Sequence, residues 1–268
     1  MKLTVLDLEN NEKGSVELPV QFGEAFRDDL IRKAVVAIDS NSRQPYGSDP
    51  RAGMKHSAEL SRRRRKYRGS YGHGISRVPR KILSRRGTRF NWVGAISPGT
   101  VGGRRAHPPK AEKVWDLKVN RKERRKAIRS AISATTDKEL VSKRGHKIPE
   151  TYPFIISDDI ESKKKTSEIK KALENLGFAD ELARTQEKKV RAGKGKARGR
   201  RYKSKKGPLL VVSDSCDLMR SARNIPGIDI VSVDRLNAGL LAPGTIAGRC
   251  TIFSKKAIEK MGKDNLYM

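Results

Sequence analysis

The chain has 268 residues, a formal net charge of +30 and a sequence pI near 10.4, so it is expected to work together with a polyanion that neutralises its positive charge. No run of about 18 apolar residues is present, and the acidic start does not resemble a signal peptide, so we expect neither a transmembrane helix nor secretion. Cys216 and Cys250 have no cysteine or histidine cluster beside them, which excludes a disulfide framework and a zinc finger and indicates a reducing compartment.

The chain begins with two expected strands and a helix. Alternating apolar residues predict strands over 2–8 and 16–20, with a turn at Lys13 and Gly14 between them. Over 22–40 the apolar residues recur at steps of four, which predicts an amphipathic helix.

Residues 43–113 form the first of two strongly basic segments. They hold nineteen lysines and arginines against three acidic residues, and their ten glycines and six prolines accompany no helical or strand periodicity. Loops of this length are usually functional or disordered, and five aromatic side chains distinguish this one from an ordinary disordered tail. We expect a long internal loop that becomes ordered on a polyanion.

Beyond residue 120, helical and strand patterns alternate. Asn120 followed by Glu123 predicts a capped helix start. Short apolar segments predict strands at 152–156, 209–212, 228–233 and 249–253. Helices are expected at 136–145, 166–176, 179–187, 215–223 and 254–261, with a short one near Asp234. This alternation is typical of an α/β fold with three layers, in which helices cover both faces of a mostly parallel sheet.

The second basic segment, 188–206, holds eleven cations and no acidic residue. Outside the two segments, thirty basic residues face twenty-seven acidic ones, an ordinary balance for a soluble domain. We therefore expect a globular α/β domain formed by 1–42 and 114–268, with 43–113 inserted as a basic loop extension and 188–206 as an RNA-binding segment within the domain.

An α/β sheet raises the question of an active site. Ser157–Asp159 and Ser213–Cys216 follow strands, where they could supply carboxylates or a nucleophile; we interpret them as helix caps, a common use of serine and aspartate. The glycines of 193–199 fit no phosphate-binding motif, and the four histidines are dispersed. We expect no catalytic residue, no metal site and no cofactor.

The basic segments have the composition of an RNA-binding surface. Residues 62–68 pack six cations and one tyrosine into seven positions, and guanidinium groups both donate to phosphates and stack on bases. The glycines that follow let the backbone approach a nucleic acid closely. Because no recognition-helix module, zipper or zinc finger is present, structured RNA is favoured over DNA. The candidate RNA-binding residues are Arg62, Arg63, Arg64, Arg65, Lys66, Tyr67, Arg68, Tyr71, His73, Arg77, Arg80, Lys81, Arg85, Arg86, Arg89, Trp92, Arg104, Arg105, His107, Lys110, Lys194, Lys196, Arg198, Arg200 and Arg201.

Five motifs along the chain carry a resemblance to a known family. They are R-G-S-Y-G-H-G-I-S-R-V-P-R (68–80), G-R-R-A-H-P-P-K-A-E-K (103–113), N-R-K-E-R-R-K-A-I-R-S-A-I-S-A-T (120–135), V-S-K-R-G-H (141–146) and A-G-K-G-K-A-R-G-R-R-Y (192–202). In these stretches, which occur in family order, the sequence resembles large-subunit ribosomal protein four of the archaeal and eukaryotic type.

The resemblance implies an α/β domain at the outside of the large ribosomal subunit. It also implies that 43–113 extends through ribosomal RNA to the wall of the polypeptide exit tunnel, with 68–80 nearest the tunnel. The implied partners are large-subunit ribosomal RNA, neighbouring ribosomal proteins and the nascent peptide near the loop tip, with neither a membrane nor a second copy of the chain.

We therefore expect a cytoplasmic, structural constituent of the large ribosomal subunit and not an enzyme. Two alternatives stay open from the sequence. One is an α/β enzyme that acts on RNA, such as a nuclease or methyltransferase, and the other is a soluble nucleic-acid chaperone.

Overall fold

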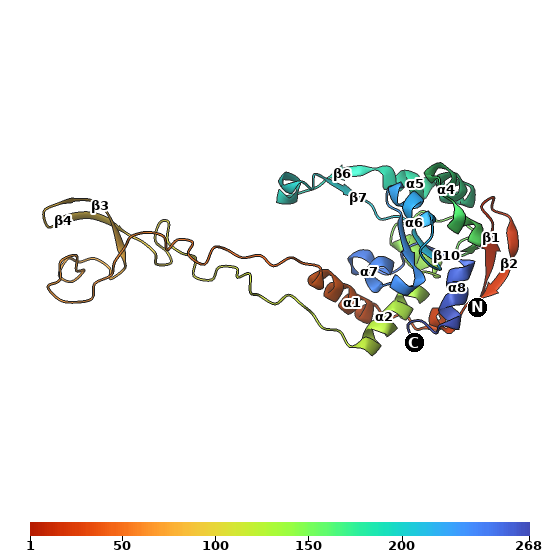
Figure 1. Ribbon diagram of the computed structural model, residues 1–268, viewed down its shortest axis with the longest axis horizontal. Coiled ribbons are helices and arrows are strands. Elements are labelled where there is room, and N and C mark those ends of the chain that lie inside the picture. The colour runs from red at the N-terminus through yellow and green to blue at the C-terminus, as the bar shows by residue number, and fades with distance from the viewer. The chain divides into compact units, whose positions relative to one another are not determined.

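The computed structural model describes residues 1–268, which divide into two compact units. Met1–Ser42 together with Asp116–Met268 form the first unit, and Arg43–Trp115 form the second. The first unit contains the central sheet and its helices, and the second contains a separate hairpin (Figure 1).

A six-stranded sheet is the centre of the first unit. Its strand order is β2-β1-β5-β10-β8-β9, and every neighbouring pair except β2-β1 is parallel. The strands are β1 (Lys2–Leu6), β2 (Glu12–Glu17), β5 (Ile155–Ile156), β8 (Leu209–Val212), β9 (Asp229–Ser232) and β10 (Thr251–Ser254). The mostly parallel sheet that the alternation of strands and helices predicts is confirmed.

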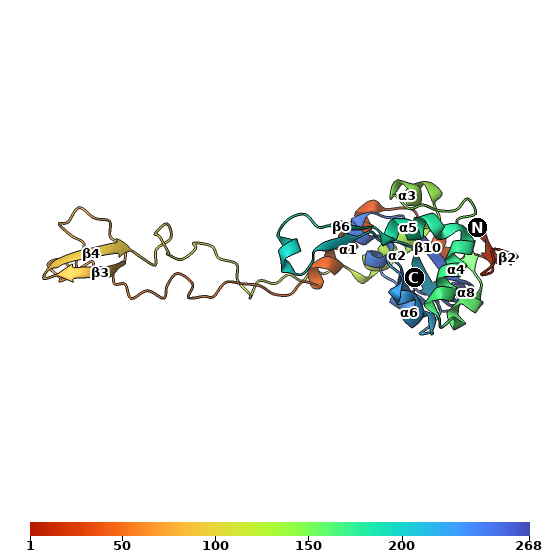
Figure 2. The ribbon, with the colours of Figure 1, turned by 90° about the horizontal axis from the view of Figure 1, so that it is seen from above.

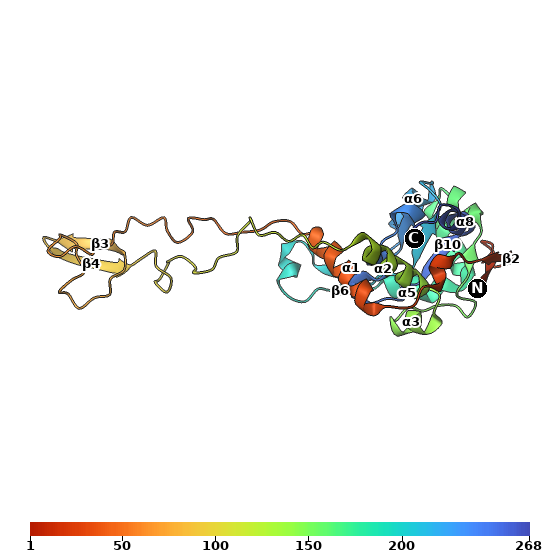
Figure 3. The same cartoon turned by 90° about the horizontal axis from the view of Figure 1, so that it is seen from below.

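Helices cover both faces of the sheet. Successive strand residues point to opposite sides, and buried apolar residues lie on both. Val5 and Ile155 belong to one buried cluster, and the residues that follow them, Leu6 and Ile156, belong to the other. The first cluster includes residues of α1 (Asp28–Asn41), α2 (Arg121–Ser133), α7 (Ala238–Leu241) and α8 (Lys255–Lys263). The second includes residues of α3 (Lys138–Lys143), α4 (Thr166–Leu173), α5 (Ala179–Gln186) and α6 (Leu218–Ser221). Helices α1 and α2 lie side by side in Figure 3, and α4 and α5 lie close together in Figure 2.

Several element boundaries differ from the sequence-based expectation. The helix expected from residue 22 begins at Asp28, because Val20–Gly23 forms a separate 3₁₀ turn that buries Phe22 and leaves Phe26 exposed. The second strand runs from Glu12 to Glu17 instead of over 16–20. The helix expected at 215–223 is confined to α6 and the 3₁₀ turn that follows it.

The predicted cap of α2 is wrong. Asn120 stands at the residue before the helix, but its side chain makes no capping hydrogen bond. Glu123, the other member of the expected pair, instead accepts a hydrogen bond of 2.7 Å from Lys33 Nζ in α1. The carboxylate therefore joins two neighbouring helices.

The second unit contains a hairpin that the sequence pattern did not predict. Strands β3 (Arg80–Arg86) and β4 (Arg89–Gly94) are antiparallel, with Ile82 opposite Trp92. A register shift between Ile82 and Ser84 interrupts the alternation of β3, which explains why no strand period is visible there.

Close backbone contacts join the two chain segments that flank this hairpin. Ser48 N donates to Pro109 O at 3.0 Å, and a Cβ atom on Gly53 would lie 2.5 Å from Arg104 N. Gly53 also has φ +74°, so glycine is required there by both space and backbone conformation. These contacts hold 43–55 against 104–115 without a regular strand ladder.

The basic segment 188–206 belongs to the first unit and also forms a hairpin. Strand β6 (Lys188–Val190) pairs antiparallel with β7 (Tyr202–Ser204), and a 3₁₀ turn, Lys194–Arg198, lies between them. All six strand residues are exposed. The hairpin therefore buries little of its own surface.

Candidate nucleic-acid interface

The cations of the second unit are mostly without acidic partners. One ion pair lies within Arg43–Trp115, between Lys55 Nζ and the Asp49 carboxylate at 2.5 Å. Cations that hold no protein carboxylate are free to neutralise phosphates, and the counterions that a nucleic acid then releases favour binding. The four arginines Arg62–Arg65 and Lys66 are exposed in a turn region, where they can reach a ligand.

Three aromatic rings meet on one side of the β3–β4 hairpin. Phe90 and Trp92 are two residues apart on β4 and therefore point to the same face; their ring centroids are 5.1 Å apart at an interplanar angle of 26°. Tyr67 meets the Phe90 ring edge-on at 5.3 Å, and its hydroxyl accepts a hydrogen bond of 3.3 Å from Arg85 Nη1. Tyr67 and Trp92 were expected site residues, whereas Phe90 was missed although its spacing from Trp92 indicates a shared face.

Cations surround these rings. The guanidinium of Arg68 lies 5.8 Å from the Tyr67 ring, and that of Arg80 lies 5.9 Å from the Trp92 ring. An open cleft of about 850 Å³ lies beside the rings. Seven of the candidate RNA-binding residues line it: Arg65, Lys66, Tyr67, Arg68, His73, Arg89 and Trp92. Its other lining residues are Gly69, Ile75, Thr88 and Phe90. The structure thus brings together residues from two separate parts of the basic segment.

Other expected residues of the second unit lie outside this cleft. Arg77 stacks on Tyr71 at 4.8 Å, and Arg85 lines a smaller cleft with Arg80. Lys81 and Arg86 lie on β3. Arg104 lies beside Gly53.

A second cleft lies where the two flanking segments meet. Its lining includes the expected residues Arg105, His107 and Lys110, together with Tyr46, Lys113 and Trp115. Tyr46 stacks on Trp115 at 5.7 Å, and the guanidinium of Arg43 lies 3.8 Å from the Trp115 ring. Sequence reasoning missed the Tyr46–Trp115 pair because its members are far apart along the chain.

The remaining expected residues lie on the hairpin of the first unit. Lys194, Lys196 and Arg198 are exposed in its 3₁₀ turn, and Arg200 and Arg201 lead into β7. The Arg201 guanidinium lies 5.6 Å from the Tyr202 ring. None of these five cations has a carboxylate partner, so the hairpin end is a second cationic surface.

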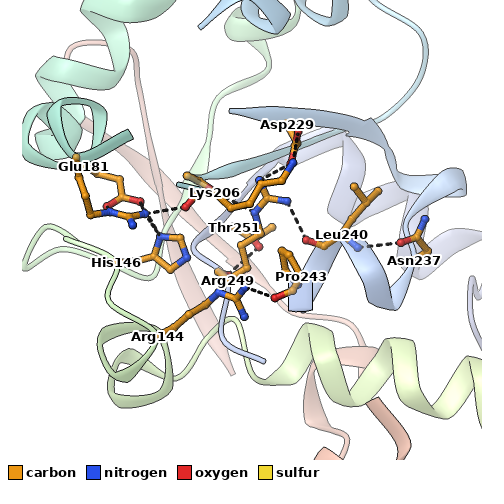
Figure 4. A network of polar contacts seen from close by, with 12 residues as sticks. Arg144, His146, Glu181, Lys206, Asp229, Asn237, Leu240, Pro243, Arg249 and Thr251 are labelled. Atoms are coloured by element: carbon orange, nitrogen blue, oxygen red, sulfur yellow. Dashed lines mark hydrogen bonds and ion pairs between the residues drawn. The ribbon is translucent and has the colours of Figure 1, made fainter. Parts of the chain in front are cut away.

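Two arginines of the α/β domain hold the base of this hairpin (Figure 4). Arg184 Nη2 donates to the carbonyl of Lys206 at 2.7 Å, and Arg249 Nε donates to the carbonyl of Gly207 at 2.9 Å. Lys206 itself pairs with Asp229 at 2.9 Å. The chain that leaves β7 is therefore fixed to the domain, whereas the hairpin end carries no such contacts.

Glu181 is the buried centre of the neighbouring polar cluster (Figure 4). Its carboxylate accepts hydrogen bonds from His146 Nδ1 at 2.6 Å, from Lys147 N at 2.9 Å and from Arg184. Burial favours the neutral acid, but these donors outweigh it and lower the pKa of Glu181. Burial lowers the pKa of His146 in turn, so the neutral imidazole is the favoured form.

The candidate enzymatic residues are engaged in structural contacts, although not as caps of their own helices. Ser157 Oγ donates to the carboxylates of Asp7 and Asp159, and Ser213 donates to Glu161. Asp158 accepts from Lys256 N at 2.8 Å, so it caps α8 and not the turn that follows it.

The thiol of Cys216 is not activated, since burial raises its pKa. No group of three or more histidine, cysteine or acidic side chains is arranged to hold a metal ion. None of the helices has the length and apolar composition needed to cross a membrane.

Known proteins are similar to this chain over most or all of its length. Residues 16–264 match the ribosomal protein L4/L1 family. The chain is 50% identical over 268 residues to the large ribosomal subunit protein uL4 of Nanoarchaeum equitans, with 100% of both chains covered. It is 43% identical over 264 residues to the uL4 protein of Archaeoglobus fulgidus, covering 98% of this chain and 99% of that one, and 45% identical over 258 residues to that of Methanococcoides burtonii, covering 96% of each. On this agreement, the chain belongs to the ribosomal protein L4/L1 family.

Proposed function

We propose that the protein is a structural constituent of the large ribosomal subunit that binds large-subunit ribosomal RNA through two basic surfaces, 43–113 and 188–206. Its family is one of structural ribosomal proteins, so the protein is not an enzyme and works in the cytoplasm as part of the ribosome. Both surfaces belong to one chain, 43–113 to its second unit and 188–206 to its first.

The observation that carries this proposal is the combination of unpaired cations and aromatic planes in the second unit. Segment 43–113 has nineteen cations, yet the single carboxylate pairing within it is that of Lys55 with Asp49. Aromatic rings stack at both of its clefts, Phe90 with Trp92 and Tyr46 with Trp115. Phosphates match the cations, and the faces of unstacked bases match the rings.

The hairpin of 188–206 supports a second contact with the RNA. Its end has the five unpaired cations from Lys194 to Arg201, while Arg184 and Arg249 hold its base on the domain. An anchored base and a free cationic end suit an element that reaches between RNA strands. Phosphate contacts of this kind position a protein without reading sequence.

The proposal extends to the exit tunnel through the family resemblance of 68–80. In this proposal, 43–113 reaches through the RNA toward the tunnel, where its end meets the nascent peptide. Neighbouring ribosomal proteins contact the α/β domain, and the protein is present as a single copy in each subunit.

The salt dependence of binding to large-subunit ribosomal RNA tests the role of the second unit. Each phosphate contact adds roughly 0.7–0.9 to the slope of log affinity against log salt. Replacing Arg62–Arg65 by alanine is expected to reduce that slope by up to about 3. A matched control replaces Lys163, Lys164, Lys165 and Lys170, four cations that pair with carboxylates of the first unit. An equal slope change in both variants, or none in either, contradicts the proposal.

A further inference from the structure

We infer that the cleft beside the β3–β4 hairpin, lined by Tyr67, Phe90 and Trp92, binds a single unstacked nucleobase of RNA. The inference rests on the proposed function and deepens it, because it names the chemical group that the cleft recognises. The occupant is one base that has left its stack. Its face lies on the aromatic rings, and its flanking phosphates bind the cations at the rim of the cleft.

The first support is the concentration of aromatic rings. Only fourteen of the 268 residues are aromatic, and three of them meet here. The Tyr67 side chain remains 51% exposed, although it contacts Phe90 and accepts a hydrogen bond from Arg85. Burying such a ring within the protein would stabilise the fold, so an exposed ring at the wall of a cleft indicates a surface that a ligand covers.

The second support is the order that the rings already have. Phe90 and Trp92 are fixed to each other at 5.1 Å by their positions on β4, and Trp92 also faces Ile82 across the hairpin. A base that stacks on a ring already held by a strand costs little ordering entropy. The pair of strands thereby supplies a firm wall in a segment that otherwise consists mostly of turns.

The third support is the cationic rim. Arg65, Lys66, Arg68 and Arg89 line the cleft, and no carboxylate does. A base cannot enter without bringing its own two flanking phosphates to the rim, where these cations lie. An aromatic wall with a cationic, acid-free rim fits a nucleotide of single-stranded RNA better than it fits a neutral apolar ligand.

The fourth support is the backbone of the segment that closes the cleft. Arg65 and Arg68 have φ of +53° and +63°, a left-handed conformation that is unfavourable for residues other than glycine. The turn over 66–69, which directly follows Arg65 and includes Arg68, is closed by Gly69 N donating to Lys66 O at 2.9 Å. Such conformations concentrate at ligand sites, and here they carry two of the rim cations.

A double experiment on the full-length protein tests this inference. Replacing Trp115 by phenylalanine leaves Trp92 as the only tryptophan and hence as a fluorescent reporter of the cleft. The probes are a decamer of riboadenylate and an abasic ribose–phosphate decamer of equal length and charge. We expect the adenylate decamer to quench Trp92 and to bind about 5- to 150-fold more tightly than the abasic one.

Variants then assign the preference to the rings. Phe90→Leu and, separately, Trp92→Leu are expected to bring the adenylate affinity, measured by anisotropy of labelled RNA, down toward the abasic value with the salt slope unchanged. Circular dichroism checks the fold, and Phe26→Leu, which removes an exposed aromatic ring outside both basic surfaces, is the matched control. The inference is overturned if the two decamers bind with equal affinity, or if polyglutamate quenches Trp92 as strongly as the adenylate decamer does. If ribosomal RNA still binds with a steep salt slope, the proposed function survives that result; if neither decamer nor ribosomal RNA binds, the proposed function itself fails.

Discussion

The fully buried guanidinium of Arg249 forms an ion pair of 2.7 Å with Asp229. Its other two nitrogens donate to the carbonyls of Gly207 and Leu240, so each nitrogen of the buried charge has a partner. Burial disfavours the charged form of Asp229, but Arg249 and Lys206 outweigh that effect and lower the pKa of the carboxyl. The pair joins β9 to the base of the 188–206 hairpin. The same buried contacts therefore stabilise the domain and hold the cationic hairpin in place.

Asp229→Asn is expected to destabilise the α/β domain by about 3 kcal/mol, because it leaves Arg249 buried without its counter-charge. Denaturant unfolding followed by circular dichroism measures the change. Asp214→Asn is the control: that carboxylate is 70% exposed, and its partner Lys260 keeps Asp234, so the change should stay within about 0.5 kcal/mol. Equal effects of the two substitutions would contradict the assigned role of the buried pair.

The stability of the domain should also depend on pH through His146. Its pKa is lowered in the folded protein because burial disfavours the imidazolium, whereas in the unfolded chain it is near the ordinary 6.5. The unfolded state therefore binds more protons below pH 6.5, and stability is expected to rise with pH up to that value and to stay level above it.

The measurement is the free energy of unfolding from mildly acidic to neutral pH. His146→Gln should flatten the slope below pH 6.5, while the titration of Glu181, whose pKa is lowered from 4.5, remains at more acidic pH. A slope of the opposite sign in the unmodified protein would show that the charged imidazole is the folded form.

Much of the α/β domain could be predicted because its signals are local. The apolar runs that became β8 and β10 and the periodic helix that became α4 need only neighbouring residues to be recognised. The β3–β4 hairpin escaped prediction because a register shift and its many cations hide the alternation. Partners such as Glu181 for His146 could not be predicted, since folding alone brings together residues so far apart in the chain.

The same distinction applies to the candidate interface. The cation clusters could be read from composition, because they are contiguous in sequence. Which cations share a cleft could not, since Arg65 and Arg89 meet there only through the hairpin. A motif can also mislead, as Asn120 shows. Its spacing from Glu123 suits a helix cap, but the Glu123 carboxylate instead accepts a hydrogen bond from Lys33 of another helix.

Shortening the 188–206 hairpin should weaken RNA binding without unfolding the domain. Replacing 192–200 by Asn-Gly removes four cations but keeps both strands and the base held by Arg184 and Arg249. The salt slope for ribosomal RNA is expected to fall by up to about 3, and the free energy of unfolding should change by no more than about 0.5 kcal/mol. A large loss of stability would mean that the hairpin end packs on the domain.

The last prediction concerns the removal of the whole second unit. Asn41 and Leu117 make reciprocal hydrogen bonds: Leu117 N donates to Asn41 Oδ1 at 2.8 Å, and Asn41 Nδ2 donates to Leu117 O at 3.3 Å. The two ends of the first unit are thus adjacent at the point where the insertion leaves and returns. Joining Ser42 to Asp116 by a short Gly/Ser linker should therefore cost only a small loop-closure entropy.

The shortened protein is expected to fold, because both buried clusters of the sheet lie entirely in residues that remain. Its net charge falls by 16, since the removed segment holds nineteen cations and three acidic residues. Circular dichroism and thermal unfolding should match those of the full chain's α/β domain, and the protein should still enter large subunits at a reduced level through 188–206. Crosslinks from nascent chains to this protein should disappear, because the segment proposed to reach the tunnel is absent. An unfolded product would show that Arg43–Trp115 completes the core of the first unit, and the division of the chain into a folded domain and an RNA-bound extension would then be wrong.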